Sequence, residues 1–252
     1  MTPVLMLVLA LVMAATSFLS GIFGMAGGMI LIGVLLALMP VPQAMALHAV
    51  TQMASNGWRG LLWWRHVRPA AAASYLAGCC AAMLLWSFWR YVPSAPTAML
   101  FLGLTPFTVR LLPERLKPDA ARVSHGLVYG AICMCLLLLT GVVGPLIDMY
   151  FLGGKLDRRE IVATKAVCQL FGHGVKLFYF SSVIDQAATV DPIMIVVAIV
   201  ASMVGTSAAR RFLEAMSDTQ YRTWAGRLIT SISGYYVLQG AYLLIPRGLP
   251  IP

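Results

Sequence analysis

The stretches HAVTQMASNGWR (residues 48–59) and KAVCQLFGHGVK (residues 165–176) place polar residues at matching positions of two otherwise apolar segments, 117 residues apart (165 against 48). On a helix, the polar side chains of each stretch fall along one stripe, because residues three or four apart share a face. A charged side chain at the centre of a membrane helix costs roughly 2.5–3.5 kcal/mol, so it usually faces a cavity or a partner. The two stretches therefore predict a pair of membrane helices whose polar stripes face an interior site.

The composition is that of a polytopic membrane protein. Of the 252 residues, 60% are hydrophobic and 11% are charged, whereas a soluble domain carries roughly a quarter charged residues. The net charge of +9 does not indicate nucleic-acid binding, because the basic residues gather in short loops between apolar segments. The five cysteines lie inside apolar segments, so we predict neither a disulfide framework nor a metal site, and we predict no cofactor.

Ten apolar segments fall into two sets of five, joined by a polar interval. A helix needs about 20 residues to cross a membrane, so segments 28–39 and 145–153 are too short to span alone. Each follows a glycine-rich break and is predicted to be the return limb of a broken helical hairpin, which is tolerated only where protein or water covers its backbone. The other segments are expected at 3–20, 43–64, 70–90 and 95–112 in the first half, and at 123–140, 161–182, 190–210 and 224–245 in the second half.

Loop charges orient the chain in the membrane. Twelve of the 18 Lys and Arg residues lie in four loops that the positive-inside rule places in the cytoplasm. Both termini are then predicted to lie outside, and five segments per half make the two halves inverted relative to each other. The twelve residues are Arg65, Arg68, Arg110, Arg115, Lys117, Arg122, Lys155, Arg158, Arg159, Arg210, Arg211 and Arg222.

Inverted repeats are typical of secondary transporters, whose site lies at mid-membrane where the repeats meet. We expect residues 1–112 to form the first repeat, 113–122 a cytoplasmic linker and 123–252 the second repeat, all within one membrane domain. The alternative is that two unrelated amphipathic stretches share the spacing by chance.

The segment from Ser20 to Gly28 (SGIFGMAGG), followed by an apolar run, resembles the glycine signature of the TauE/SafE sulfite exporter family, within the class of toluene sulfonate uptake permeases. The resemblance extends over nearly the whole chain through its length, its paired halves and the order of hairpin and polar helix. The second copy, GVVGP (residues 141–145), keeps two glycines and then diverges. The resemblance implies transport of sulfite, a sulfonate or another small organosulfur anion, in either direction.

A sulfite or sulfonate head group is a compact anion with three acceptor oxygens, so its site needs N–H and O–H donors together with positive charge. The polar stripes supply such groups. Interhelical hydrogen bonds, or a lysine that reaches the membrane surface, are the structural alternatives. The substrate-binding candidates are His48, Thr51, Gln52, Asn56, Lys165, Gln169 and His173.

The glycine breaks offer a second way to bind an anion, since a half-helix beginning there presents free backbone N–H groups and a positive dipole end to it. The candidate backbone positions are Gly24, Gly27, Gly28, Gly141 and Gly144. Three charged residues are predicted to couple or gate transport. Asp148 is the acidic residue expected well inside the membrane, either as a protonation site or as a structural partner of Lys165 or His173, and Arg59 and Lys176 lie nearer the ends of their helices.

These observations predict an all-α secondary transporter of a bacterial inner membrane, coupled to protons and working on a small sulfur anion by alternating access. An anion channel is the alternative. An intramembrane enzyme or assembly factor has less support, since the sequence lacks H-E-x-x-H and G-x-S-x-G motifs, and we expect no enzyme. The expected partners are the anion and lipid, without nucleic acid, and small residues (Ala70 to Ala73, Gly78, Ala81 and Ala82) would permit a homo-oligomer.

Overall fold

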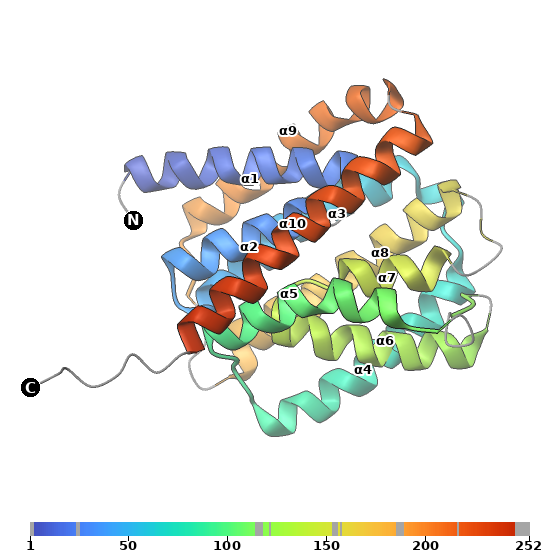
Figure 1. The fold of residues 1–252 in the computed structure, drawn as a ribbon, viewed down its shortest axis with the longest axis horizontal. Helices are drawn as coiled ribbons and strands as arrows, with labels where there is room; N and C mark the ends of the chain where they lie inside the picture. Colours follow the sequence, from blue (N-terminus) through green and yellow to red (C-terminus); the bar gives the residue numbers. More distant parts are fainter. Residues whose placement is uncertain are drawn as a thin grey trace, which may run out of the picture.

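The computed structural model describes residues 3–23, 26–113, 118–120, 122–152, 156, 158–184, 189–215 and 217–244. The described residues form helices and connecting segments and contain no strand, which confirms the all-α prediction (Figure 1). The helices are α1 (Pro3–Phe23), α2 (Ala26–Leu38), α3 (Val41–Leu62), η1 (Trp64–His66), α4 (Pro69–Trp89), α5 (Ala95–Leu111), α6 (Val123–Thr140), α7 (Gly144–Leu152), α8 (Arg158–Phe178), the π-helical η3 (Tyr179–Val183), α9 (Pro192–Ala215) and α10 (Asp218–Leu244).

The two short limbs follow the glycine breaks, as the sequence indicates. α2 has 13 residues and α7 has nine, too few for either to cross a membrane alone. Gly141 ends α6 in the left-handed conformation at φ 82°, and a Cβ atom added there would lie 2.8 Å from Ile32 Cγ1. A glycine is therefore required at this break for both its backbone angle and its space. Gly24, in the first break, lies outside the described residues.

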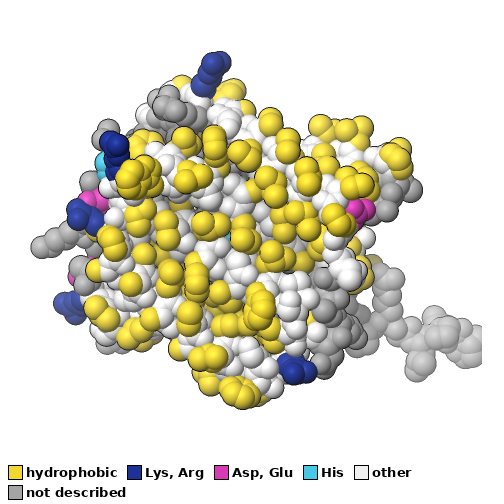
Figure 2. Space-filling view, turned by 180° about the vertical axis from the view of Figure 1, so that it is seen from behind, with side chains coloured by type: hydrophobic (Ala, Val, Ile, Leu, Met, Phe, Trp, Pro, Cys, Tyr) yellow, Lys and Arg dark blue, Asp and Glu magenta, His cyan; other side chains and the backbone are white. Residues whose placement is uncertain are grey.

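In the part of the chain that the structure describes, four helices are long and apolar enough to cross a membrane, namely α1, α4, α6 and the first 18 residues of α9. Large apolar side chains cover the outside of the molecule, among them Phe88 at 85% exposed. Figure 2 shows hydrophobic side chains over the middle of one face and Lys and Arg side chains at its edges. Such a surface suits lipid rather than water. α3 and α8, which carry the polar stripes, lie among the other helices.

Helices of the first half pack against helices of the second half. α1 contacts α9, α4 contacts α6, and α5 contacts α10 (Figure 1). Glycines allow the backbones to approach closely: a Cβ added to Gly78 would lie 2.8 Å from the carbonyl carbon of Leu127, and one added to Gly205 would lie 2.9 Å from the nitrogen of Phe18. The helices of the two halves therefore alternate in the packing. Gly78 allows close packing of α4 on α6 within one chain.

α3 and α8 run antiparallel with their polar stripes facing each other. Four contacts along the pair show this register: as the residue number on α3 rises, that of its partner on α8 falls. From one end to the other they join His48 to Lys176, Met53 to Gly174, Gly57 to Leu170 and Gly60 to Ala166. This seam between α3 and α8 brings the two sequence stretches together.

Candidate functional site

Lys176 lies at the centre of a polar cluster that joins both halves. Its Nζ donates to His48 Nδ1 over 2.8 Å and to the carbonyl oxygen of Gly141 over 3.0 Å. The side chain is fully buried, at 0% exposed, although the sequence places Lys176 in the last turn of α8. It is enclosed rather than near the membrane surface because η3 continues the helix beyond Phe178.

His48 links Lys176 to the first hairpin. Its Nε2 lies 3.0 Å from the carbonyl oxygen of Gly28. Since that oxygen can only accept, Nε2 carries the hydrogen and Nδ1 accepts from Lys176. One chain of hydrogen bonds thus joins Gly28 of the first hairpin to Gly141 of the second through His48 and Lys176.

Two further polar side chains complete this group, here called the central cluster (His48, Gln52, His173 and Lys176, with the carbonyls of Gly28 and Gly141). The His173 and His48 rings lie 5.5 Å apart between centroids. Gln52 lies beside Gly28, where an added Cβ would be 3.4 Å from Gln52 Nε2. Gln52 Nε2 and His173 Nδ1 are buried and have no hydrogen-bond partner among the described residues. They are therefore available to a bound molecule.

The remaining predicted residues of the stripes serve different neighbours. Thr51 Oγ1 donates to the Leu47 carbonyl over 2.8 Å, and Asn56 Nδ2 donates to the Gln52 carbonyl over 2.9 Å. Both bonds stay within α3, so these two side chains use their donors on the backbone of their own helix. Gln169 is half-buried on α8.

Two hairpin glycines, Gly28 and Gly141, turn their carbonyls towards the central cluster. The Gly141 N–H donates to the Leu137 carbonyl over 2.9 Å and is not available to an anion, contrary to expectation. Gly27 packs on α1, since an added Cβ would lie 2.8 Å from the nitrogen of Ser20. Gly27 and Gly28 lie in the first turn of α2 and Gly144 begins α7, and first-turn N–H groups have no partner within their own helix.

A second cluster (Ser20, Arg59, Asp148 and Lys165) lies at the other end of the seam. Lys165 Nζ forms a hydrogen-bonded ion pair with Asp148 Oδ1. Arg59 Nη2 donates to the Ser20 carbonyl over 3.4 Å. Lys165 is eleven residues from Lys176, or about 16 Å along α8. The structure thus places Lys165 with Asp148, at a different level from His173.

Sequence reasoning missed two hydroxyl residues beside the breaks. Thr140 Oγ1 donates to the Val142 carbonyl over 2.6 Å and accepts from the Val142 N–H over 3.2 Å, which shapes the turn before α7. The hydroxyl of Ser20 is buried and has no partner among the described residues. The signal was present, because the spacing of 120 that relates Gly21 to Gly141 also relates Ser20 to Thr140.

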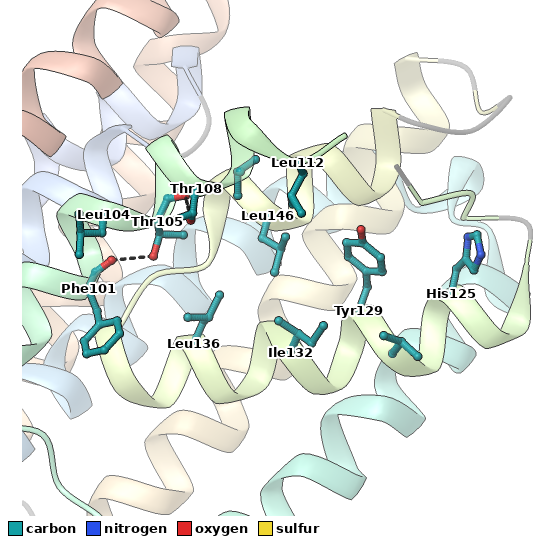
Figure 3. Close-up of a pocket in the computed structure, with 12 residues that line it drawn as sticks. Phe101, Leu104, Thr105, Thr108, Leu112, His125, Tyr129, Ile132, Leu136 and Leu146 are labelled. Carbon is teal, nitrogen blue, oxygen red and sulfur yellow. Dashed lines mark hydrogen bonds between the residues drawn. The ribbon is translucent and has the colours of Figure 1, made fainter. Parts of the chain in front are cut away.

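An apolar groove of about 640 Å³ between α5 and α6 is separate from this site (Figure 3). Leu136, Ile132 and Phe101 line it, and the Thr105 hydroxyl donates to the Phe101 carbonyl of its own helix over 2.7 Å. Such a lining offers no buried cation to an anion. Among the described residues, no three His, Cys, Asp or Glu side chains gather closely enough to hold a metal ion.

Comparison with known protein families decides the identity. The model of the family described as Sulfite exporter TauE/SafE matches residues 8–236, nearly the whole chain. The chain belongs to the TauE/SafE sulfite exporter family. Comparisons with curated proteins and with solved structures gave no match.

Membership of the TauE/SafE family confirms the resemblance seen in the sequence. With its long apolar helices, the protein is a multi-pass integral membrane protein of an exporter family. It is a transporter for a small anion and not an enzyme, as predicted. The central cluster and the second cluster are the places where such an anion could meet positive charge.

Proposed function

We propose that this TauE/SafE protein moves sulfite or a small sulfonate across the bacterial inner membrane by alternating access, and that the anion binds at the central cluster. The observation that carries this proposal is the environment of Lys176. No carboxylate among the described residues forms an ion pair with it, although it is fully buried. A buried ammonium without a counter-charge is strongly disfavoured, so the transported anion supplies the missing charge.

The donors around Lys176 suit an anion with three oxygens. Lys176 uses two of its three N–H groups on His48 and Gly141, which leaves one. Gln52 Nε2 and one nitrogen of the His173 ring add two directional donors from opposite sides of the seam. Charge-assisted hydrogen bonds from such a set favour a compact oxyanion. Backbone N–H groups at the start of α2 and of α7 lie close to the breaks and would add to the site.

The inverted repeat is supported by the pattern of helix contacts. Exchange of the halves replaces α1 with α6, α4 with α9, and α2 with α7. The α1–α9 contact then becomes the α6–α4 contact, and the α10–α2 contact becomes the α5–α7 contact, all of which occur. This correspondence supports two repeats within residues 1–112 and 123–252. It agrees with a topology in which both termini lie outside, and with rocking of one repeat against the other.

We further propose that transport is coupled to protons through Asp148, His48 or His173, the carboxyl and imidazole groups of the two clusters. Flux into proteoliposomes tests the carrier. A carrier saturates with sulfite or methanesulfonate and responds to an imposed pH gradient, whereas a channel gives flux that stays linear to high concentration.

Three alanine variants test the site itself. Gln52→Ala and His173→Ala should each weaken anion binding by about ten-fold, because each removes one donor worth roughly 1–1.5 kcal/mol. Gln169→Ala should weaken it less, because Gln169 is half-buried on α8 outside the central cluster. Anion-induced thermal shifts of the purified variants give the affinities, and expression level is the control. Wild-type affinity in all three variants would show that the anion binds elsewhere.

A further inference from the structure

The contacts of the two clusters correspond through the spacing of the sequence repeat. In the central cluster, the polar helix contacts its hairpin where His48 bonds to Gly28. In the second cluster, Lys165 pairs with Asp148. The spacings are 117 from His48 to Lys165 and 120 from Gly28 to Asp148, the two values that the sequence shows for the polar helices and the hairpins. Asp148 thus occupies the position that Gly28 occupies in the first half.

A second pair of contacts corresponds to within one residue. Lys176 donates to the carbonyl of Gly141, and Arg59 donates to the carbonyl of Ser20. Lys176 follows Arg59 by 117 residues, and Gly141 follows Ser20 by 121. Each cluster therefore has one cation that bonds to the backbone at the end of the helix before the break.

The second cluster is less enclosed by the surrounding chain than the central cluster. The Asp148 side chain is 25% exposed and that of Lys165 is 13% exposed, whereas Lys176 is fully buried. Arg59 and Lys165 lie towards the same end of the seam, because their neighbours Gly60 and Ala166 are in contact. An anion that enters from this end therefore meets Lys165 before it reaches Lys176, about 16 Å further along the seam.

We propose that Asp148 is an internal substitute for the transported anion. While no anion is present, its carboxylate neutralises Lys165; the arriving anion displaces it, and Lys165 with Arg59 forms a second binding station. The inference rests on the proposed function and adds a regulated entry site to it. Because the Asp148 side chain is already partly exposed, the displaced carboxylate can turn outwards, so its charge is not stranded inside the protein.

The ion pair lowers the apparent affinity for the anion, since only the fraction of molecules with an open pair can bind at this station. Removal of the carboxylate should therefore tighten binding on the order of ten-fold, the gain expected when the open fraction rises from about a tenth to one. A purely structural ion pair would give the opposite result, because its loss would loosen the site.

The test measures binding of sulfite and methanesulfonate to purified protein in detergent. Asp148→Asn removes the charge at nearly constant size, and Asp148→Gly restores the residue that the first half carries at this position. Both should lower the apparent Kd on the order of ten-fold relative to wild type. The matched control is Glu160→Gln, since Glu160 also lies on α8 and pairs with a basic residue, Arg68, and its apparent Kd should stay at the wild-type value.

The double variant Asp148→Asn/Lys165→Met removes both charges and should lose the gain. An apparent Kd that is unchanged or higher in whichever Asp148 variant folds overturns the proposal, as does a gain that persists in the double variant. If wild type binds neither anion, the proposed function itself fails. Wild-type binding without a gain in the Asp148 variants removes only the role of Asp148.

Discussion

The central cluster and the second cluster occupy corresponding positions of the two halves but hold their cations differently. In the central cluster, Lys176 is fully buried and bonds to His48 and a carbonyl. In the second cluster, Lys165 is partly exposed and bonds to a carboxylate. The sequence spacing relates the two clusters, and they differ in a few side chains, above all Asp148 in place of Gly28.

The difference determines at which cluster an anion gains the larger electrostatic interaction energy. When a cation already has a carboxylate partner, an incoming anion gains only the difference in free energy between the new ion pair and the old one. A buried cation without one offers nearly the full interaction. Under the proposed function, tight binding belongs to the central cluster and entry to the second cluster, and changing either cluster into the other tests this assignment.

The largest effect is expected from Gly28→Asp, which gives the central cluster the carboxylate of the second. The new carboxylate would pair with Lys176 and oppose the anion, so sulfite affinity should fall on the order of 100-fold or more relative to Gly28→Asn. Gly28→Asn has the same size without the charge, and Gln52 must move to a similar extent in both variants. Anion-induced thermal shifts provide the measurement, and equal affinities in the two variants would contradict a charge-based site.

A smaller effect is expected from Lys176→Met, which removes the charge but keeps most of the volume. Loss of a charge-assisted hydrogen bond of about 1.5–3 kcal/mol should weaken sulfite binding by roughly 10- to 100-fold. The comparison variant Lys165→Met should weaken it far less, because Lys165 is already neutralised by Asp148. Both variants can be titrated with sulfite in detergent, and an equal loss in the two would remove the distinction between the clusters.

The smallest effect is expected from Gly27→Ala, which concerns packing of the first hairpin. An added Cβ would overlap the backbone of α1 near Thr16 and Ser20, so the free energy of unfolding should fall by about 1–3 kcal/mol. At the corresponding position of the second half, 120 residues on, stands the buried Ile147. Ile147→Val should cost about 0.5–1.5 kcal/mol. Thermal unfolding tests the order, and Gly27→Ala as stable as wild type would mean that α1 and α2 can separate.

Much of the fold could be predicted because apolar length, glycine breaks and loop charges act locally. The described α-helices begin and end close to the expected segments, apart from α9, which ends at Ala215 rather than at 210, and α10, which begins at Asp218 rather than at 224. The short limbs α2 and α7 follow from the glycine positions. The sequence also marked His48, Gln52 and His173, because polar residues inside apolar helices need an interior partner.

Less of the site could be predicted, because partners across a seam depend on register. The matching spacing suggests that Lys165 and His48 play equal parts, and they do lie at equivalent positions. However, α3 and α8 run antiparallel, so His48 meets Lys176 at one end while Lys165 meets Asp148 at the other. Ser20 and Thr140 were missed because their contacts depend on the shape of the breaks.

The sequence by itself determined an all-helical membrane transporter of the TauE/SafE family, with two polar helices and two broken hairpins. These properties depend on residue type and spacing along one chain. Only the tertiary structure decided which cation is buried without a carboxylate and which hairpin carbonyls hold it. The physical reason is that burial and counter-charge are set by the neighbours of a side chain in space, and here those neighbours come from the opposite half of the chain.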